Sequence, residues 1–473
     1  MTDKLDFLHE SIKEALKRGA RYADIFIQSG EGHSVHFEDG KIDGISSSTS
    51  DGAGSRVIVD DRTFYAHAPG NDEAAVSASF AECAASAGMD GLRESSSSAM
   101  LMERGEPIAP PAVDFLREID DIIKKESKHI RQSSYRYSVS HRRVLVIKPD
   151  GTAAFDRRLY SSFAAQVVAE RDGVLQTGSE RRCMALGEDD FWRGSAPLTV
   201  ARTALRRALL MLEASPCPAG SMNVLMDGEA GGTIIHEACG HGLEADIVEK
   251  DYSVYRGRIG EKVAHESVTM IDDAAMPGLY GAYRFDDEGT PAQRTVLIEN
   301  GVLKGYLTDI LSSQMYGLPL TGNGRRESYR NIPVPRMSNT YLTPGKDDFD
   351  SMLARTGNGL YVKKMGGGEV DPTSGDFVFY VTEGYLVEKG KIGVPVRGAI
   401  LTGNGPEALS RISALGENLV MDPGICGKSG QGVPVTDGQP SMPVSYTHLS
   451  ATFTASCGMR MLSSVTQRFE TGP

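Results

Sequence analysis

Two histidines flank a glutamate near the middle of the chain, in the stretch His236-Glu237-Ala238-Cys239-Gly240-His241. In the familiar motif His-Glu-x-x-His, the two histidines are four residues apart and lie on one face of a helix. Here they are five apart, and five steps of about 100° leave the second side chain roughly 140° away from the first. A regular helix would therefore point the imidazoles in different directions. We predict a helix that is distorted or ends between them, with Gly240 and Gly242 as suitable places for a bulge.

The residue types in this stretch are those of a metal site. Neutral imidazoles are common zinc ligands, and the glutamate of the familiar motif takes a proton from metal-bound water. Most of the other histidines are scattered over the first third of the chain without ligand spacing. We therefore predict that His236 and His241 present their imidazoles to one zinc ion. The alternative is that both are ordinary packed histidines.

Length and charge restrict the class of protein. A chain of 473 residues predicts about two to three domains. The formal net charge of −13 argues against a surface for nucleic acid or anionic membranes. The six cysteines are widely spaced and form no Cys-x-x-Cys pair, which indicates a reducing compartment. The sequence shows neither a signal-peptide core nor a run of about 18 apolar residues, so we expect a cytoplasmic protein without a membrane span.

The first 190 residues mix helical and strand patterns. They predict helices, hairpin turns and a polar linker in the following places: helices at 4–18, 71–87 and 112–127, turns at Asp39-Gly40 and Asp60-Asp61, a linker at 92–111, and antiparallel strands over 133–182. No cluster of catalytic residue types occurs among them. We interpret residues 1–190 as one α+β domain that serves as a scaffold or contacts a partner.

The pattern changes after a helix predicted at 197–214. A short strand at 224–226 leads to the histidine stretch, and strands and turns dominate beyond it. Hairpin patterns occur at 295–307 and at 377–387, where the second continues into a turn at Lys389-Gly390. Residues 191–442 therefore predict a strand-rich, mostly antiparallel domain that carries the metal site.

Three other motifs could indicate a different binding site. Gly427-Lys428-Ser429 resembles the end of a phosphate-binding loop, but Asp422 stands where that loop needs glycine. Gly403-Asn404-Gly405 fits a loose dinucleotide fingerprint, but it lies among antiparallel hairpins and not in a βαβ unit. We interpret the acidic run Asp286-Asp287-Glu288 as a solvated turn rather than a second metal site.

Several longer motifs, taken in order, resemble those of the TldD/PmbA family of metallopeptidases, and the resemblance covers roughly residues 5 to 442. The matching stretches are His236-Glu-Ala-Cys-Gly-His-Gly-Leu-Glu244, Gly257-Arg-Ile-Gly-Glu261, Asp286-Asp-Glu-Gly-Thr-Pro291, Thr321-Gly-Asn-Gly-Arg-Arg-Glu-Ser328, Pro335-Arg-Met-Ser-Asn-Thr340, Gly366-Gly-Gly-Glu-Val-Asp371 and Asp422-Pro-Gly-Ile-Cys-Gly-Lys428.

The resemblance implies a ligand set and a catalytic residue. It makes His236, His241 and Cys426 the three zinc ligands, with Glu237 as the general base that activates zinc-bound water. Three protein ligands and an open position are what a catalytic zinc needs. Cys239 is the rival thiolate, and we interpret it as a small packed residue because the cysteine of the family lies near the C-terminus.

The resemblance also implies a substrate and a partner. Because the metal residues are present, the chain is similar to the TldD-like catalytic branch, which hydrolyses peptide bonds in unfolded or short peptides. The family implies a heterodimer with a motif-lacking PmbA/TldE-like subunit, and a homodimer is the other arrangement. The alternative function is a non-catalytic partner subunit, in which a structural zinc holds the C-terminal segment to the core.

The end of the chain departs from the family pattern. After Met442 the sequence continues as Pro443-Val-Ser-Tyr-Thr-His-Leu449 and then as a Ser/Thr-rich stretch without periodicity. This segment resembles translated sequencing-adapter sequence. We therefore expect residues 443–473 to be non-native and poorly ordered, which makes His448 and Cys457 poor site candidates.

Overall fold

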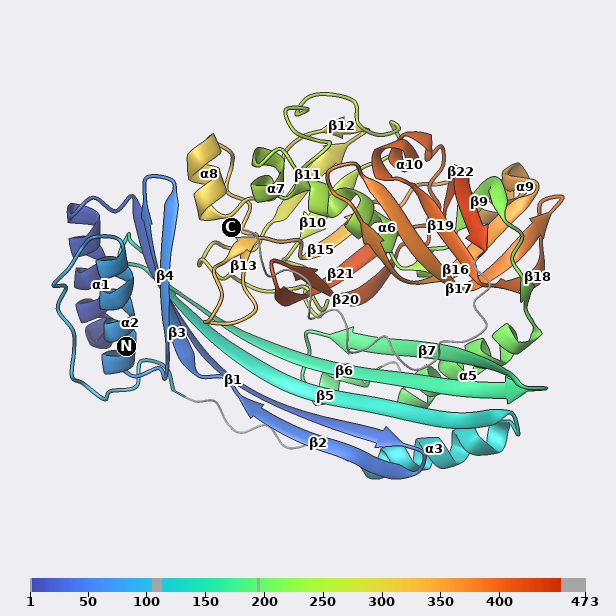
Figure 1. Ribbon diagram of the computed structural model, residues 1–473, viewed down its shortest axis with the longest axis horizontal. Helices are drawn as coiled ribbons and strands as arrows, with labels where there is room; N and C mark the ends of the chain where they lie inside the picture. Colours follow the sequence, from blue (N-terminus) through green and yellow to red (C-terminus); the bar gives the residue numbers. More distant parts are fainter. Residues whose placement is uncertain (1, 104–112, 194–195, 452–473) are drawn as a thin grey trace, which may run out of the picture.

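The computed structural model describes residues 2–103, 113–193 and 196–451. In Figure 1, a long curved sheet from the first part of the chain lies beneath a second, strand-rich part. Helices pack against the two ends of the long sheet. The α+β class predicted from the sequence is confirmed.

The long sheet has the strand order β4-β3-β1-β5-β6-β7, and β2 pairs with the second half of β1. Every pairing in it is antiparallel, and the turns at Asp39-Gly40 and Asp60-Asp61 fall between paired strands as predicted. The strands are β1 (Tyr22–Glu38), β2 (Lys41–Thr49), β3 (Gly52–Val59), β4 (Arg62–Pro69), β5 (Ile130–Ile147), β6 (Ala153–Arg171) and β7 (Val174–Met184).

Helices cover this sheet in two groups, and each group has its own core. Leu8 and Ile12 of one group pack with Phe80 and Ile25, and Leu116 and Phe163 belong to the other. The helices are α1 (Thr2–Lys17) and α2 (Glu73–Ser86) at one end, and α3 (Asp114–Glu126), α4 (Glu188–Phe191) and α5 (Pro197–Glu213) at the other.

The second part of the chain contains two larger sheets. One has the order β12-β11-β10-β15-β21-β20, in which only the β15–β21 pairing is parallel. The other runs β16-β9-β22-β19-β17-β18-β8, and β16 also pairs with β17, so its path closes on itself. Their strands are β8 (Ser215–Pro216), β9 (Gly220–Met226), β10 (Met270–Asp273), β11 (Arg294–Glu299), β12 (Val302–Leu303), β15 (Asn339–Leu342), β16 (Gly359–Val370), β17 (Asp376–Glu388), β18 (Lys391–Arg397), β19 (Ala399–Asn404), β20 (Val420–Lys428), β21 (Gln431–Gln439) and β22 (Met442–Ala451).

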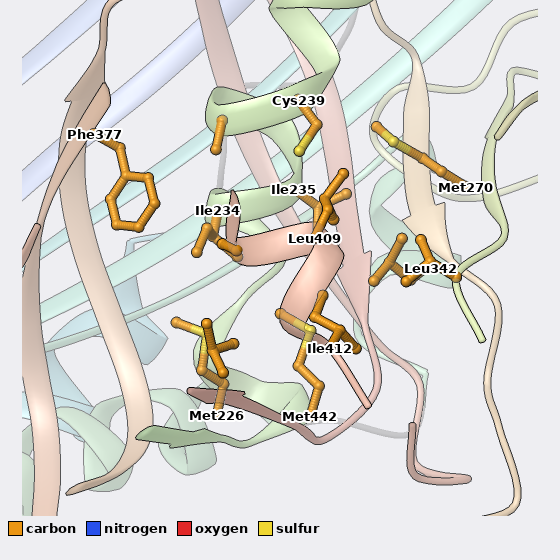
Figure 2. Packing of buried hydrophobic residues seen from close by; sticks show 14 of the residues in the cluster. Met226, Ile234, Ile235, Cys239, Met270, Leu342, Phe377, Leu409, Ile412 and Met442 are labelled. Carbon is orange, nitrogen blue, oxygen red and sulfur yellow. The ribbon is translucent and has the colours of Figure 1, made fainter. Parts of the chain in front are cut away.

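Short helices and one small hairpin complete this part. Its main hydrophobic core lies between the closed sheet and the helical stretch around residue 236, where Ile234, Ile235, Leu409 and Met442 pack together (Figure 2). The remaining elements are α6 (Thr233–Ile235), α7 (Ala245–Glu249), α8 (Ile310–Tyr316), α9 (Phe349–Thr356), α10 (Gly405–Arg411), and the pair β13 (Gly324–Arg325) and β14 (Val334–Pro335).

The fold excludes the dinucleotide-binding motif considered for residues 403–405. β19 does lead directly into α10, as a nucleotide-binding strand and helix would. However, β19 pairs antiparallel with both β17 and β22. A dinucleotide fingerprint works at the end of a parallel strand in a βαβ unit, so this segment is a strand and a capping helix of the closed sheet.

The acidic run Asp286-Asp287-Glu288 is not a solvated turn, and our interpretation was wrong. Its three side chains are at most 1% exposed, and they lie where the long sheet meets the second part. Arg56 of β3 donates to Glu288 at 2.5 Å, and Arg158 of β6 donates to Asp287 at 2.8 Å. A buried carboxylate needs such partners. The run therefore joins the two parts of the molecule.

The described part of the chain continues past residue 442 as a strand. Residues 443–451 belong to β22, which pairs antiparallel with β9 and β19 and completes the closed sheet. Val444 is 3% exposed and belongs to the main core. Residues 452–473 lie outside the described residues, and both the non-native origin and the poor order of residues 443–473 stay predictions.

Candidate metal centre

The chain bends at the two histidines by widening one helical turn. α6 is followed by a π-helical turn over His236–Gly240 and a 3-10 turn over His241–Leu243. The backbone N–H of His241 donates to the carbonyl of His236, a bond that spans five residues. A π turn holds one residue more than an α turn, and the predicted distortion is confirmed.

The glycines serve this turn by leaving room, not by unusual backbone angles. Gly240 has φ −58° and ψ −50°, which any residue can adopt. A Cβ atom at Gly240 would lie only 2.0 Å from Sδ of the buried Met337, and one at Gly242 would lie 3.0 Å from the ring of Tyr255. The turn therefore packs against its neighbours more closely than a side chain would allow.

Three side chains from two distant segments converge beside this turn. His241 Nε2 lies 3.4 Å from Sγ of Cys426, which comes from β20. The rings of His236 and His241 are perpendicular, with centroids 4.9 Å apart. One possible ligand atom from each of the three residues lies within 4.8 Å of the other two, and all three residues are buried. Two imidazoles and a thiolate form a donor set that suits zinc.

Each imidazole is oriented by its own carboxylate. His236 Nδ1 lies 2.6 Å from Asp437 of β21, and His241 Nδ1 lies 2.9 Å from Glu244. When Nδ1 donates to a carboxylate, the lone pair of Nε2 is available to a metal, and metal-binding histidines have this arrangement. The surroundings of both rings therefore fit a bound zinc ion.

The charges around the thiol favour its ionised form. Burial alone would raise the pKa of Cys426, but the neighbouring His236 and hydrogen bonds from both histidines outweigh burial and lower the pKa to about 4. Burial would likewise lower the pKa of His241, but Glu244 and Cys426 raise it to about 10. A thiolate is thus present at neutral pH, and metal binding would release protons from the imidazoles.

Glu237 lies beside the three possible ligands without being one of them. Its Oε2 atom is 3.8 Å from His241 Nε2, and its side chain is 26% exposed. Burial raises the pKa of this carboxyl group above its ordinary value. A carboxylate next to a metal centre with a raised pKa has the properties of a general base.

A cavity of about 760 Å³ opens in front of His236 and Glu237. Residues of the long sheet form one wall, including Gln132, Arg136 and Gln166. The opposite wall comes from β16, β20 and β21 and includes the glycines at 366–368, with Lys364, Asp422 and Asp437. The first part of the chain therefore contributes to the site itself, and its predicted role as scaffold or partner-contact region omitted this contribution.

Cys239 points away from the centre into the hydrophobic core. It is 1% exposed and packs near Ile235 and Met270, and Figure 2 shows it among these side chains. Burial raises the pKa of its thiol to about 12. The interpretation of Cys239 as a packed residue is confirmed.

A second group of possible ligand atoms lies at the end of the β1–β2 hairpin. It consists of His36, Glu38 and Asp43, with His36 Nδ1 2.9 Å from Asp43. These side chains are 29% to 63% exposed. Surface ion pairing accounts for their positions.

Sequence reasoning missed the residues that surround the ligands. Glu244 carried a signal, since it follows His241 by three residues and can reach it around a helical turn. Asp437 carried none, because it lies 201 residues from His236 and meets it only through the β20–β21 hairpin. The buried ion pairs of Lys428 were likewise invisible in the sequence.

The fold and the centre define the class of protein: a metallopeptidase with a His/His/Cys group beside a carboxylate. Three domain descriptions match the chain, namely PmbA/TldA metallopeptidase domain 1 (residues 23–88), central domain (105–212) and C-terminal domain (219–450). The chain belongs to the PmbA/TldD family of metallopeptidases.

Individual relatives agree with this assignment. The chain is 36% identical to "Metalloprotease TldD homolog" from Haemophilus influenzae, over 92% of this chain and 94% of the relative. It is also 36% identical to "Zinc metalloprotease TldD homolog" from Saccharolobus solfataricus, over 50% and 54%. The structure of TldE from Thermococcus kodakarensis has the same fold, with a TM-score of 0.72 at 18% identity, covering 94% of this chain and all of that one. Among the described residues, no helix is both long and apolar enough to span a membrane.

Proposed function

We propose that the chain is a zinc-dependent metallopeptidase in which His236, His241 and Cys426 bind the metal ion and Glu237 is the catalytic base. One observation supports the proposal above all: the three possible ligands converge, and the carboxylate beside them lines a cavity. The name of the Saccharolobus relative supports zinc as the metal. Three protein ligands leave one coordination position for water or substrate, as in catalytic zinc sites.

When bound, zinc would polarise the scissile carbonyl and lower the pKa of a water molecule held next to it. The protein groups do the remaining work. Glu237 accepts a proton from the attacking water and returns it to the nitrogen of the leaving peptide. Asp437 and Glu244 keep the imidazole rings in one orientation throughout, because each holds an Nδ1 atom.

The cavity favours extended peptides as substrates. Its walls come from strands on both sides, so a chain without its own tertiary structure can enter where a folded domain cannot. We propose that residues 1–190 and 191–442 act as two domains that enclose the substrate between them, in a cytoplasmic enzyme. The TldE likeness supports pairing with a motif-lacking subunit of that kind, and a homodimer is the other arrangement.

Zinc content and hydrolysis of an unfolded peptide, measured on three variants, test this function. We expect the wild-type chain to hold one zinc ion and to cleave the peptide. Glu237→Gln should keep zinc but lose cleavage by a factor of about 10² to 10⁴, and Cys426→Ala should lose zinc. Cleavage is measured on the chain alone and, if none is seen, after a TldE-like subunit is added.

Three results would contradict the proposal. If the wild-type protein binds no zinc, the proposed metal centre is wrong. Zinc binding with cleavage that Glu237→Gln leaves unchanged would mean that Glu237 is not the base, and zinc binding without cleavage in either arrangement would favour the structural zinc of a non-catalytic subunit.

A further inference from the structure

Lys428 is a buried lysine at the edge of the metal centre. Its side chain is 9% exposed. Its ammonium group donates to Glu244 at 2.9 Å, to Asp246 at 2.6 Å and to the carbonyl of Pro335 at 3.0 Å. An ammonium group has three protons to donate, so all of them are used. A lysine in this position is held rigidly.

The position of Lys428 on β20 relates it directly to the thiol. Cys426 and Lys428 are two residues apart on one strand, so their side chains point to the same side of the sheet. The carbonyl of Cys426 also accepts a hydrogen bond at 2.5 Å from the fully buried Arg336. The strand that supplies one possible ligand is thus fixed in place by two buried cations.

The partner of Lys428 is the same carboxylate that orients the second imidazole. Oε2 of Glu244 lies 2.9 Å from Lys428 Nζ and 2.9 Å from His241 Nδ1. The contacts therefore form a closed ring that runs from the Cys426 thiol to His241, on to Glu244 and Lys428, and back along β20. A shift of β20 would move the thiol and the imidazole support together.

The ammonium group of Lys428 compensates the buried carboxylate of Glu244. Glu244 is completely buried, and an uncompensated carboxylate there would cost several kcal/mol. The carboxylate of Glu244 accepts a hydrogen bond from the Nδ1–H of His241, and Nε2 is then the ring nitrogen on the side of Cys426.

We propose that Lys428 is a positioning residue of the metal centre: through Glu244 it fixes the His241 imidazole relative to the thiolate that its own strand carries. The inference rests on the proposed zinc site and assigns the residue that couples two of its ligands. Lys428 is not one of the three possible ligands, so we expect its effect to appear in metal affinity.

Zinc affinity of purified variants, measured by competition with a chromophoric chelator, tests the proposal. Loss of a partner that orients a ligand costs about 10- to 100-fold in metal affinity, and we expect this loss for Lys428→Met. Lys428→Arg keeps the charge and should recover part of the affinity. Asp246→Asn is the matched control, since it removes the other carboxylate of the same ammonium group without touching His241, and it should lower zinc affinity clearly less than Lys428→Met does.

A double-mutant cycle identifies the route of the effect. If Lys428 acts through Glu244, Lys428→Met should add little to the loss that Glu244→Gln already causes. Circular dichroism of the metal-free proteins checks that each variant is folded. Should Lys428→Met fail to fold, Lys428→Gln, which keeps a hydrogen-bond donor, takes its place in the same comparison.

Three outcomes would overturn the inference: wild-type affinity in the Lys428 variant, an equal loss in Asp246→Asn, or additive losses in the cycle. These outcomes differ from a failure of the proposed function. Wild-type protein that binds no zinc defeats the function itself, whereas zinc-binding wild type with an unaffected Lys428→Met variant defeats only the role of Lys428.

Discussion

Each imidazole of the centre depends on one carboxylate, but the two carboxylates differ in their surroundings. Glu244 has the ammonium group of Lys428 beside it at 2.9 Å. Asp437 lies in the wall of the cavity with its side chain 13% exposed, and burial raises its pKa although His236 lowers it. The carboxylate that holds His241 thus has a lysine beside it, and the one that holds His236 is paired with the histidine. A substitution at either carboxylate should show how much the orientation of the ring contributes to metal binding.

Asp437→Asn removes the negative charge that accepts the hydrogen bond from the Nδ1–H of His236. An amide in that position can also donate, which would favour the wrong tautomer of the ring. We expect zinc affinity to fall by about 10- to 100-fold while the fold is kept. Chelator competition measures the affinity. Asp422→Asn is the control, since Asp422 lines the same cavity but bonds to Lys364, and an equal loss there would contradict the role of Asp437.

A methyl group at Gly240 tests whether room, and not backbone freedom, is what the π turn requires. In Gly240→Ala the new atom would lie 2.0 Å from Met337 Sδ, so buried groups must shift. Overpacking of this kind costs about 1–3 kcal/mol, and weaker zinc binding should accompany it. Chemical denaturation measures the cost. Gly305→Ala, where nothing lies within 4 Å of the new atom, should be nearly neutral; a neutral Gly240→Ala would refute the packing argument.

At the scale of elements, local sequence signals predicted individual turns and helices better than the contacts between distant segments. Turn residues such as Asp39-Gly40 and Lys389-Gly390 located hairpins correctly, because turn chemistry is local. The histidine spacing predicted the distorted turn for the same reason. The Asp286-Asp287-Glu288 run was misread, since its arginine partners lie more than 100 residues away. The place of Cys426 in the site came from the family resemblance, because no local pattern links it to the histidines.

Strand β16 supplies an element-scale test of the cavity. Its register with β17 shifts between Met365 and Gly368, where Gly366 and Gly367 have no assigned partner, and all three glycines line the cavity. A Cβ at Gly367 would meet nothing within 4 Å. Gly367→Val should therefore fold and bind zinc normally, but its side chain would occupy space that a peptide needs. We expect kcat/KM to fall by about tenfold.

The matched control for this variant is Gly44→Val, a strand glycine of β2 with equally open space and no place in the cavity lining. It should leave peptide hydrolysis unchanged. If both variants cleave at the wild-type rate, the space beside β16 is not used by substrate. If Gly367→Val loses zinc, the substitution has disturbed the centre and not the cavity.

For the whole molecule, the proposed function requires contact between the long sheet and the second part, because the cavity has walls from both. Buried ion pairs hold this contact. Asp287 lies between Arg158 at 2.8 Å and Arg142 at 3.7 Å, and its carboxylate also accepts the backbone N–H of Arg326 at 2.8 Å. A contact built from charges makes the junction sensitive to pH as well as to substitution.

Asp287→Asn should weaken this junction in a pH-dependent way. Burial would raise the pKa of Asp287, but Arg158 and Arg142 outweigh burial and lower it to about 2, from the ordinary value of 3.8. A depressed pKa means that the carboxylate stabilises the fold above about pH 4 and that this stabilisation is lost as the pH falls through about 2. Breaking a buried pair costs about 3–5 kcal/mol. Urea unfolding at pH 7 should therefore show the full deficit of the variant, and the difference from wild type should shrink between pH 4 and pH 3. A deficit that stays constant over that range would mean that Asp287 contributes by packing and not by charge.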